Sequence, residues 1–165
     1  MPATTILVGV TPGQPPVVLE AAVRFARAFD ARLVCAHVDA GRVITSFDPD
    51  GALLTTPIDP DGDEDELRFP PELEADIAER LGASGVPWTT SVVSGEPADG
   101  LRREAERVGA ELIVLGTRER GRWQGVVDFF AGSLAARLAH RQARPVVVVP
   151  VAPAAPSERL PWEPA

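Results

Sequence analysis

The segment from Glu111 to Pro150 constrains the fold of this chain more than any other. It begins with an apolar run that leads through Gly116 into a loop rich in glycine and arginine. A helical pattern starts at Gly132 and Ser133, and the segment ends in a run of valines. In open parallel sheets, ligands bind where loops leave the carboxyl ends of strands, and helix N-termini there offer N–H groups to anions. The segment therefore predicts an α/β fold with a phosphate-binding loop.

Further apolar runs have the length of strands and show no polar alternation, which is typical of strands covered on both faces of a parallel sheet. The predicted strands are 5–10, 31–38, 87–93, 112–115 and 146–149. Helical spacing lies between them. The first helix should present one apolar face made of Val18, Ala21, Ala22, Phe25 and Phe29. The inward residues of the next two should be Leu73, Ile77 and Leu81, then Leu101, Ala105 and Val108. The last helix is predicted over 132–141.

Two segments lack the sustained hydrophobic period of a helix or a strand. The first, 39–69, is rich in Asp, Pro and Gly and predicts a long acidic loop or insertion at about 40–69. Its alternating aspartates resemble a calcium loop, but Glu64 and Pro70 stand where an EF-hand has glycine and glutamate. The second, 151–165, is a proline-rich tail, either a disordered end or a docking peptide around Trp162. We therefore expect one domain over 1–150 followed by this tail.

The composition excludes several functional classes. The net charge of −8 argues against binding to nucleic acid or to an anionic membrane. No apolar run approaches the ~20 residues of a membrane span, and no secretory signal is visible, so we expect a cytoplasmic protein. The single cysteine, Cys35, lies in an apolar run and is expected to be buried and inert.

The sequence favours a binding protein over an enzyme. His37 and His140 are the only histidines, and neither has a nucleophile close to it in sequence. There is no metal-ligand spacing of Cys and His and no Gly-x-Ser-x-Gly motif. We therefore assign no catalytic residue and no metal ligand. A slow nucleotide hydrolase stays as an alternative, because bound ATP needs only a positioned water and a cation.

Three pieces of the chain together resemble the universal stress protein family: ILVGV, SGEPADGLRREAERVGAELIVLGTR and AGSLAARLAHRQARPVVVVP. The resemblance covers about residues 4–150. It implies an open five-stranded parallel sheet in the order 3-2-1-4-5 with helices on both faces, the Rossmann-like fold of adenine nucleotide alpha hydrolases. It also implies a homodimer paired through the last strand, which consists of Val146, Val147, Val148 and Val149. An exposed apolar edge strand invites such pairing.

In nucleotide-binding members of that family, the loop after strand four has Gly, two residues, Gly, nine residues, Gly, then Ser or Thr. Gly116 matches the first glycine, and Gly132 with Ser133 matches the final pair. Glu119 stands at the second glycine, and Gly121 is the nearest candidate for it. Glycines let the backbone approach phosphate oxygens, and a serine at a helix N-terminus can donate its hydroxyl and N–H.

The resemblance also implies contacts to the nucleoside. Thr11 stands where ATP-binding members carry an aspartate, and it can hydrogen-bond a ribose or base without supplying a charge. The backbone at Val38 is placed to read an adenine edge, and Leu115 to contact a base. Arg118 adds positive charge to the loop, together with Arg120 and Arg122.

Three interpretations follow from these residues. The loop binds ATP or another adenine nucleotide, with Mg²⁺ only when nucleotide is bound. Alternatively, the loop is a plain connection in a dimeric interaction scaffold that binds no nucleotide. In the third interpretation, the arginines hold a different anion.

Overall fold

Strands and helices alternate along most of this chain. The computed structural model describes residues 4–47, 53–57, 67–117 and 134–151. Its strands are β1 (Thr4–Val10), β2 (Ala31–Asp39), β3 (Arg42–Phe47), β4 (Leu53–Pro57), β5 (Trp88–Ser94), β6 (Ala110–Gly116) and β7 (Val146–Val149). The described helices are α1 (Val17–Phe29), α2 (Pro71–Gly82), α3 (Pro97–Arg107) and α5 (Leu134–Arg141). In these ranges, no helix has both the length and the apolar character needed to cross a membrane.

The central sheet has five parallel strands in the order β5-β2-β1-β6-β7. Numbered along the chain, these strands follow the order 3-2-1-4-5, which confirms the predicted topology. β1 pairs with β2 from Thr4 opposite Ala31 to Val10 opposite His37. On its other side β1 pairs with β6, which returns from much later in the sequence. From β1 the chain adds strands first on one side of the sheet (β2 and β5) and then on the other (β6 and β7). The topological switch point therefore lies between β1 and β6.

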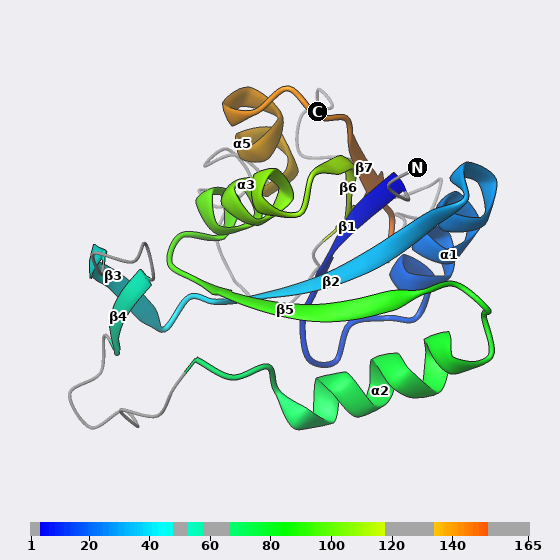
Figure 1. Ribbon diagram of the computed structural model, residues 1–165, viewed down its shortest axis with the longest axis horizontal. Coiled ribbons are helices and arrows are strands. Elements are labelled where there is room, and N and C mark those ends of the chain that lie inside the picture. The colour runs from blue at the N-terminus through cyan, green and yellow to red at the C-terminus, as the bar shows by residue number, and fades with distance from the viewer. Residues whose placement is uncertain (1–3, 48–52, 58–66, 118–133, 152–165) are drawn as a thin grey trace, which may run out of the picture.

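Helices cover both faces of this sheet (Figure 1), with α1 and α2 on one side and α3 and α5 on the other. Each side has its own core. Ile6 and Val8 on β1 pack toward α1 and α2, while Leu7 packs toward α3 and α5. Alternate residues of β1 therefore serve opposite cores, and this explains why its sequence is apolar without interruption.

The predicted helix faces are largely confirmed. Leu73, Ile77 and Leu81 of α2 are buried, and so are Leu101 and Ala105 of α3. Pro70 precedes α2 and Pro71 opens it, where a missing N–H costs nothing. Cys35 is fully buried as expected, and burial raises the pKa of its thiol to about 12.

Two expectations are wrong. The segment expected to be irregular contains two strands, β3 and β4, which pair antiparallel and stand apart from the central sheet beyond the end of β2 (Figure 1). Phe29 was expected on the buried face of α1, but its side chain is 52% exposed and its ring stacks on Phe25. It is the last residue of α1, and the helix ends at Asp30 in a left-handed conformation. The first helix instead buries Ala26.

Candidate functional site

A cavity of about 450 Å³ opens where β1, β2 and β6 end. This is the carboxyl edge of the sheet at the switch point, where open α/β folds bind their ligands. Its volume falls within the range of ~300–1,000 Å³ that is usual for small-molecule sites. The described residues that line it are Gly9, Val10, Thr11, Pro12, Gly13, Gln14, Pro15, Ala36, His37, Val38, Pro97, Leu101, Leu115, Gly116, Thr117, Leu134 and Val151.

Two glycines that line the cavity are tightly packed by their neighbours. A Cβ atom on Gly9 would lie 2.6 Å from Cδ2 of Leu115, and a Cβ atom on Gly116 would lie 2.8 Å from Cγ2 of Val18. Neither position has room for a side chain without movement of its neighbours. Because both glycines line the cavity, main-chain atoms at the ends of β1 and β6 can contact a bound ligand.

The turn that follows β1 forms the next part of the wall. The N–H of Gln14 donates to the carbonyl of Thr11 at 3.2 Å, which closes the turn. Gly13 inside it has a φ of +72°, a value that glycine adopts without strain. The Gln14 side chain folds back, and its Nε2 donates to the carbonyl of Gly9 at 3.4 Å. These bonds hold the Thr11 backbone at the cavity wall.

His37 is the ionisable residue among the described lining residues. Its Nδ1 lies 3.2 Å from the carbonyl oxygen of Val10. Because a carbonyl only accepts, Nδ1 must carry the proton of this bond, and in the neutral ring Nε2 is then an acceptor. The ring also meets the edge of Phe69, with centroids 6.1 Å apart and planes at 74°. Strand register and this ring contact together fix the orientation of the imidazole.

Thr117 ties the ends of β6 and β7 together beside the cavity. Its N–H donates to the carbonyl of Val149 at 2.9 Å, and its Oγ1 accepts from the N–H of Val151 at 3.0 Å. These two bonds place Val151 against Gly116, where its Cγ1 would be 3.1 Å from an added Cβ atom.

Helices α3 and α5 supply the remaining wall. Pro97 and Leu101 come from α3, and Leu134 is the first described residue of α5. The helix α3 starts where it does because the carboxylate of Glu96 accepts from the N–H groups of Ala98 and Asp99, each at 3.0 Å. Such a cap satisfies N–H groups that the first helical turn leaves unpaired.

Half of the residues predicted for the site can be placed. Thr11, Val38, Leu115 and Gly116 all line the same cavity, although they come from three different strand ends. The other four predicted residues, Arg118, Gly121, Gly132 and Ser133, lie outside the residues that the structure describes. So do Trp162 and the alternating aspartates at 59–65.

Sequence reasoning missed several lining residues, including Gly9, Gln14, Leu101 and Leu134. His37 was noted only as a weak catalytic candidate. The register of the sheet carried a usable signal for it, because Val10 and His37 are partners at the last paired position of β1 and β2. Residues on α3 and α5 carried no such signal, since their distance from the strand ends depends on helix packing.

The cavity offers a ligand neutral walls. Its described lining is mostly apolar, with hydroxyl, amide and imidazole groups at a few points and no carboxylate, lysine or arginine. Within the described ranges, no group of three or more His, Cys, Asp or Glu side chains is arranged to hold a metal ion. This part of the cavity suits a flat, uncharged group that hydrogen-bonds at its edges.

Comparison with known proteins places the chain in a family context. A sequence model of the universal stress protein family matches residues 2–150. Universal stress protein YxiE of Bacillus subtilis (strain 168) is 28% identical over 136 residues, which make up 79% of this chain and 87% of that protein.

Solved structures share the architecture. A universal stress protein in complex with cAMP superposes with a TM-score of 0.60 at 22% identity, over 91% of this chain and 98% of that one. The universal stress protein from Archaeoglobus fulgidus in complex with dAMP gives a TM-score of 0.56 at 17% identity, over 90% and 98% of the two chains. These likenesses confirm the Rossmann-like fold predicted from the sequence.

Proposed function

Because this chain belongs to the universal stress protein family, we propose that its cavity binds an adenine nucleotide, with ATP as the first candidate. The chain would then act as a nucleotide-responsive binding module of a cytoplasmic stress response. One observation carries the proposal: four residues predicted for a nucleotide site line one cavity at the switch point of the sheet. Two structures with the same fold, at low sequence identity, hold cAMP and dAMP.

The walls suit a nucleoside. Val38 and Leu115 offer apolar contact to the faces of a base, and the backbone at the end of β2 offers hydrogen bonds to its edge. The hydroxyl of Thr11 and the amide of Gln14 stand on the same wall and can bond to the ribose. Thr11 supplies no negative charge, so we expect affinity below that of a site with an aspartate at this point.

The phosphates would extend past Gly116 toward the loop that follows β6. In this proposal Gly121, Gly132 and Ser133 contact phosphate oxygens through N–H and hydroxyl groups, and Arg118 supplies positive charge. A Mg²⁺ ion would enter with the phosphates, because phosphate oxygens are the hard ligands it prefers.

We also propose that two copies pair through β7. This strand is the edge of the sheet, it consists of valines, and the Val148 side chain is 44% exposed. An unpaired apolar edge of this kind favours pairing with a second edge.

The test of nucleotide binding begins with protein purified without added nucleotide. Any ligand released on denaturation is identified by mass spectrometry, and ATP, adenosine and GTP are then titrated by calorimetry. The Thr11→Trp variant places a large ring at the cavity wall and should abolish binding. Thr89→Trp is the matched control, because Thr89 is also exposed but lies on β5 away from the cavity.

The result separates the three interpretations. Binding of ATP and adenosine that is lost only in Thr11→Trp supports the proposed site. No copurified nucleotide and no heat at millimolar ATP would contradict it and favour the interaction scaffold. Steady formation of ADP by the wild-type protein, absent in Thr11→Trp, would identify a hydrolase instead of a sensor.

A further inference from the structure

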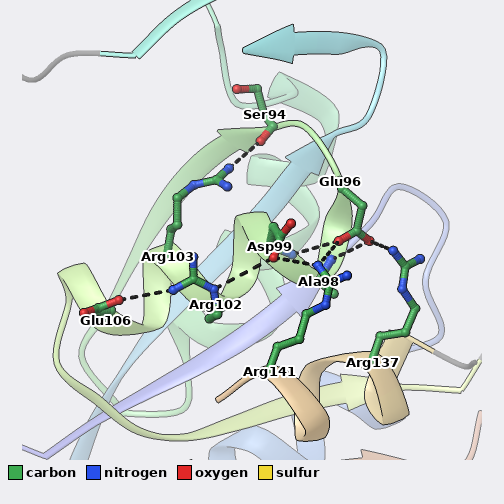
Figure 2. Close-up of polar contacts among 9 residues, drawn as sticks. All are labelled: Ser94, Glu96, Ala98, Asp99, Arg102, Arg103, Glu106, Arg137 and Arg141. Atoms are coloured by element: carbon green, nitrogen blue, oxygen red, sulfur yellow. Dashed lines mark hydrogen bonds and ion pairs between the residues drawn. The ribbon is translucent and has the colours of Figure 1, made fainter. Parts of the chain in front are cut away.

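Helices α3 and α5 are joined at one end by charged side chains (Figure 2). Arg137 on α5 reaches Glu96 at the start of α3, with 2.9 Å between Nη2 and Oε1. One turn later on α5, Nη1 of Arg141 lies 2.9 Å from Oδ1 of Asp99 and 3.8 Å from Oε2 of Glu96. We call these four residues, Glu96, Asp99, Arg137 and Arg141, the helix clamp.

The acidic half of the clamp is fixed by its own helix. Both oxygens of Glu96 are already held by the N–H groups of Ala98 and Asp99. Its carboxylate therefore cannot follow Arg137 if α5 shifts along α3. Asp99 lies in the first turn of α3, and the hydrogen bond from Arg141 holds the pKa of that carboxyl below its usual value, so the carboxylate keeps its charge.

The basic half of the clamp belongs to a helix that needs support. The described part of α5 spans 8 residues, and a helical segment of this length is not stable on its own. Its Leu138 is fully buried in the same core as Ala98 and Leu101, and this contact holds α5 against the sheet. The charged contacts add to this packing at the start of α3, through side chains that are 32–48% exposed.

The clamp adjoins the candidate site. Pro97, which lines the cavity, directly follows Glu96 in the chain. Leu134, which also lines it, lies three residues before Arg137 and therefore shares its side of α5. Glu96 and Arg137 are thus each close to a wall residue, and the ion pair between them bears on how far apart the Pro97 and Leu134 parts of the wall lie.

We propose that Glu96 and Arg137 are positioning residues for the cavity: the ion pair between them sets the spacing of the α3 and α5 walls and so tunes ligand affinity without touching the ligand. This proposal rests on the proposed function, since it concerns the same cavity. It assigns a role to charges that the nucleotide site itself does not use.

Arg137 could instead contact a phosphate of the ligand. Binding of adenosine, which has no phosphate, distinguishes this role from the positioning role. Loss of a positioning residue weakens adenosine and ATP by the same factor, because the wall contacts the nucleoside. Loss of a phosphate ligand weakens ATP and leaves adenosine unchanged.

The experiment compares Arg137→Gln, Arg137→Lys and the wild-type protein, with Arg24→Gln as the matched control on the exposed side of α1. Arg137→Gln leaves the Glu96 cap of α3 intact. Calorimetry gives the affinity for adenosine and for ATP, and hydrogen exchange reports the protection of α5 amides in protein without nucleotide. Thermal midpoints are recorded for all four proteins.

Arg137→Gln is expected to weaken both ligands about threefold to tenfold, the size of a typical coupling through a packed element. Exchange in 134–141 should speed up while exchange in α1 stays unchanged. Arg137→Lys should recover most of the affinity, and Arg24→Gln should match the wild type.

Unchanged exchange in α5 would overturn the clamp, and faster exchange with unchanged affinity would overturn its effect on the cavity. A loss confined to ATP would make Arg137 a phosphate ligand instead. If the wild-type protein binds neither ligand, the proposed function fails, and the positioning role fails with it even where the exchange data support a clamp.

Discussion

Arg107 closes over Glu104 on helix α3, donating hydrogen bonds of 2.8 Å from Nε and 2.5 Å from Nη2 to the two carboxylate oxygens. Glu104 is only 3% exposed, whereas the Arg107 side chain is 66% exposed. A carboxylate is thus buried beneath an arginine that stays in contact with water. Burial alone would raise the pKa of Glu104, but hydrogen bonds from Arg107 and Ser91 outweigh burial and bring it below its ordinary value.

Replacing Glu104 should destabilise the fold. Glu104→Ala leaves a gap under Arg107 and removes the partner of Ser91, so we expect a loss of about 2 kcal/mol in the free energy of unfolding. Urea titration followed by circular dichroism measures this. Glu106→Ala is the control, because Glu106 is 70% exposed on the same helix and should change stability by no more than about 0.5 kcal/mol. Equal effects of the two substitutions would show that burial of Glu104 does not matter.

Glu104 should also contribute to acid sensitivity. A carboxyl whose pKa is lowered by folding stabilises the native state above its unfolded pKa, and this contribution disappears as the pH falls through the native pKa. The ordinary value here is 4.5, so the wild-type protein should lose stability more steeply below that pH than Glu104→Gln does. Urea midpoints measured between pH 7 and pH 3 test this. Parallel curves for the two proteins would contradict the lowered pKa.

Gly116→Ala should damage both the cavity and the fold. The new Cβ atom would lie 2.8 Å from Val18 and 3.1 Å from Val151 and Gln14, so the side chains around it must move. We expect a loss of about 1–3 kcal/mol, the usual cost of overpacking, and weaker ATP binding. In contrast, Gly82→Ala adds a Cβ atom with nothing within 4 Å of it, and should leave stability and binding near the wild-type values. An ATP affinity equal to that of Gly82→Ala would place the ligand elsewhere.

Cys35 should be unreactive in the folded protein. Its thiol is fully buried on β2 and its pKa is raised to about 12, so almost no thiolate forms at pH 8. A chromogenic disulfide reagent should detect no free thiol at that pH until the protein is unfolded in guanidinium, and then one per chain. Rapid labelling of native protein would mean that the centre of the sheet opens readily.

Val148→Arg should convert the proposed dimer to a monomer. A charge on the exposed side of β7 would be buried without a partner when two edges pair. Sedimentation at micromolar concentration measures the change in mass. Phe29→Arg replaces another exposed apolar residue, 52% exposed at the end of α1, and should leave the dimer intact. A monomeric wild-type protein would rule out pairing through this edge.

Most of the architecture could be predicted from the sequence, because the central strands are recognisable as apolar runs. Ile6 to Val10 and Leu112 to Leu115 are apolar on both faces, and only a sheet covered on two sides buries such runs. Proline suits the first position of a helix, and α2 and α3 begin at Pro71 and Pro97. Local rules decide these features, so local sequence was sufficient for them.

Other features were not predicted, either because the average composition of a long segment hid a local pattern or because tertiary packing determines them. The β3–β4 pair was missed because Asp, Pro and Gly are frequent across the segment 39–69 as a whole. The strands still carry a local signal, since the β-branched residues Val43, Ile44, Thr55 and Thr56 stand on either side of an Asp-Pro-Asp-Gly sequence that is typical of turns. The link from Glu96 to Arg137 joins residues far apart in sequence, and no single motif marks it. Leu134 reaches the cavity for the same reason, through the packing of α5 on α3.

The position of β1 in the sheet also has a consequence during synthesis. β1 is synthesised first, yet one of its two neighbours, β6, is synthesised only after three helices. Thr5 on β1 therefore cannot pair with Ala110 on β6 until that point. Until then one flank of β1 has no strand to bond to in its own chain, which is the situation that slows folding and favours association between nascent chains. During synthesis the central sheet therefore stays incomplete until β6 has been made, and the flank of β1 that later pairs with β6 is an open edge until then.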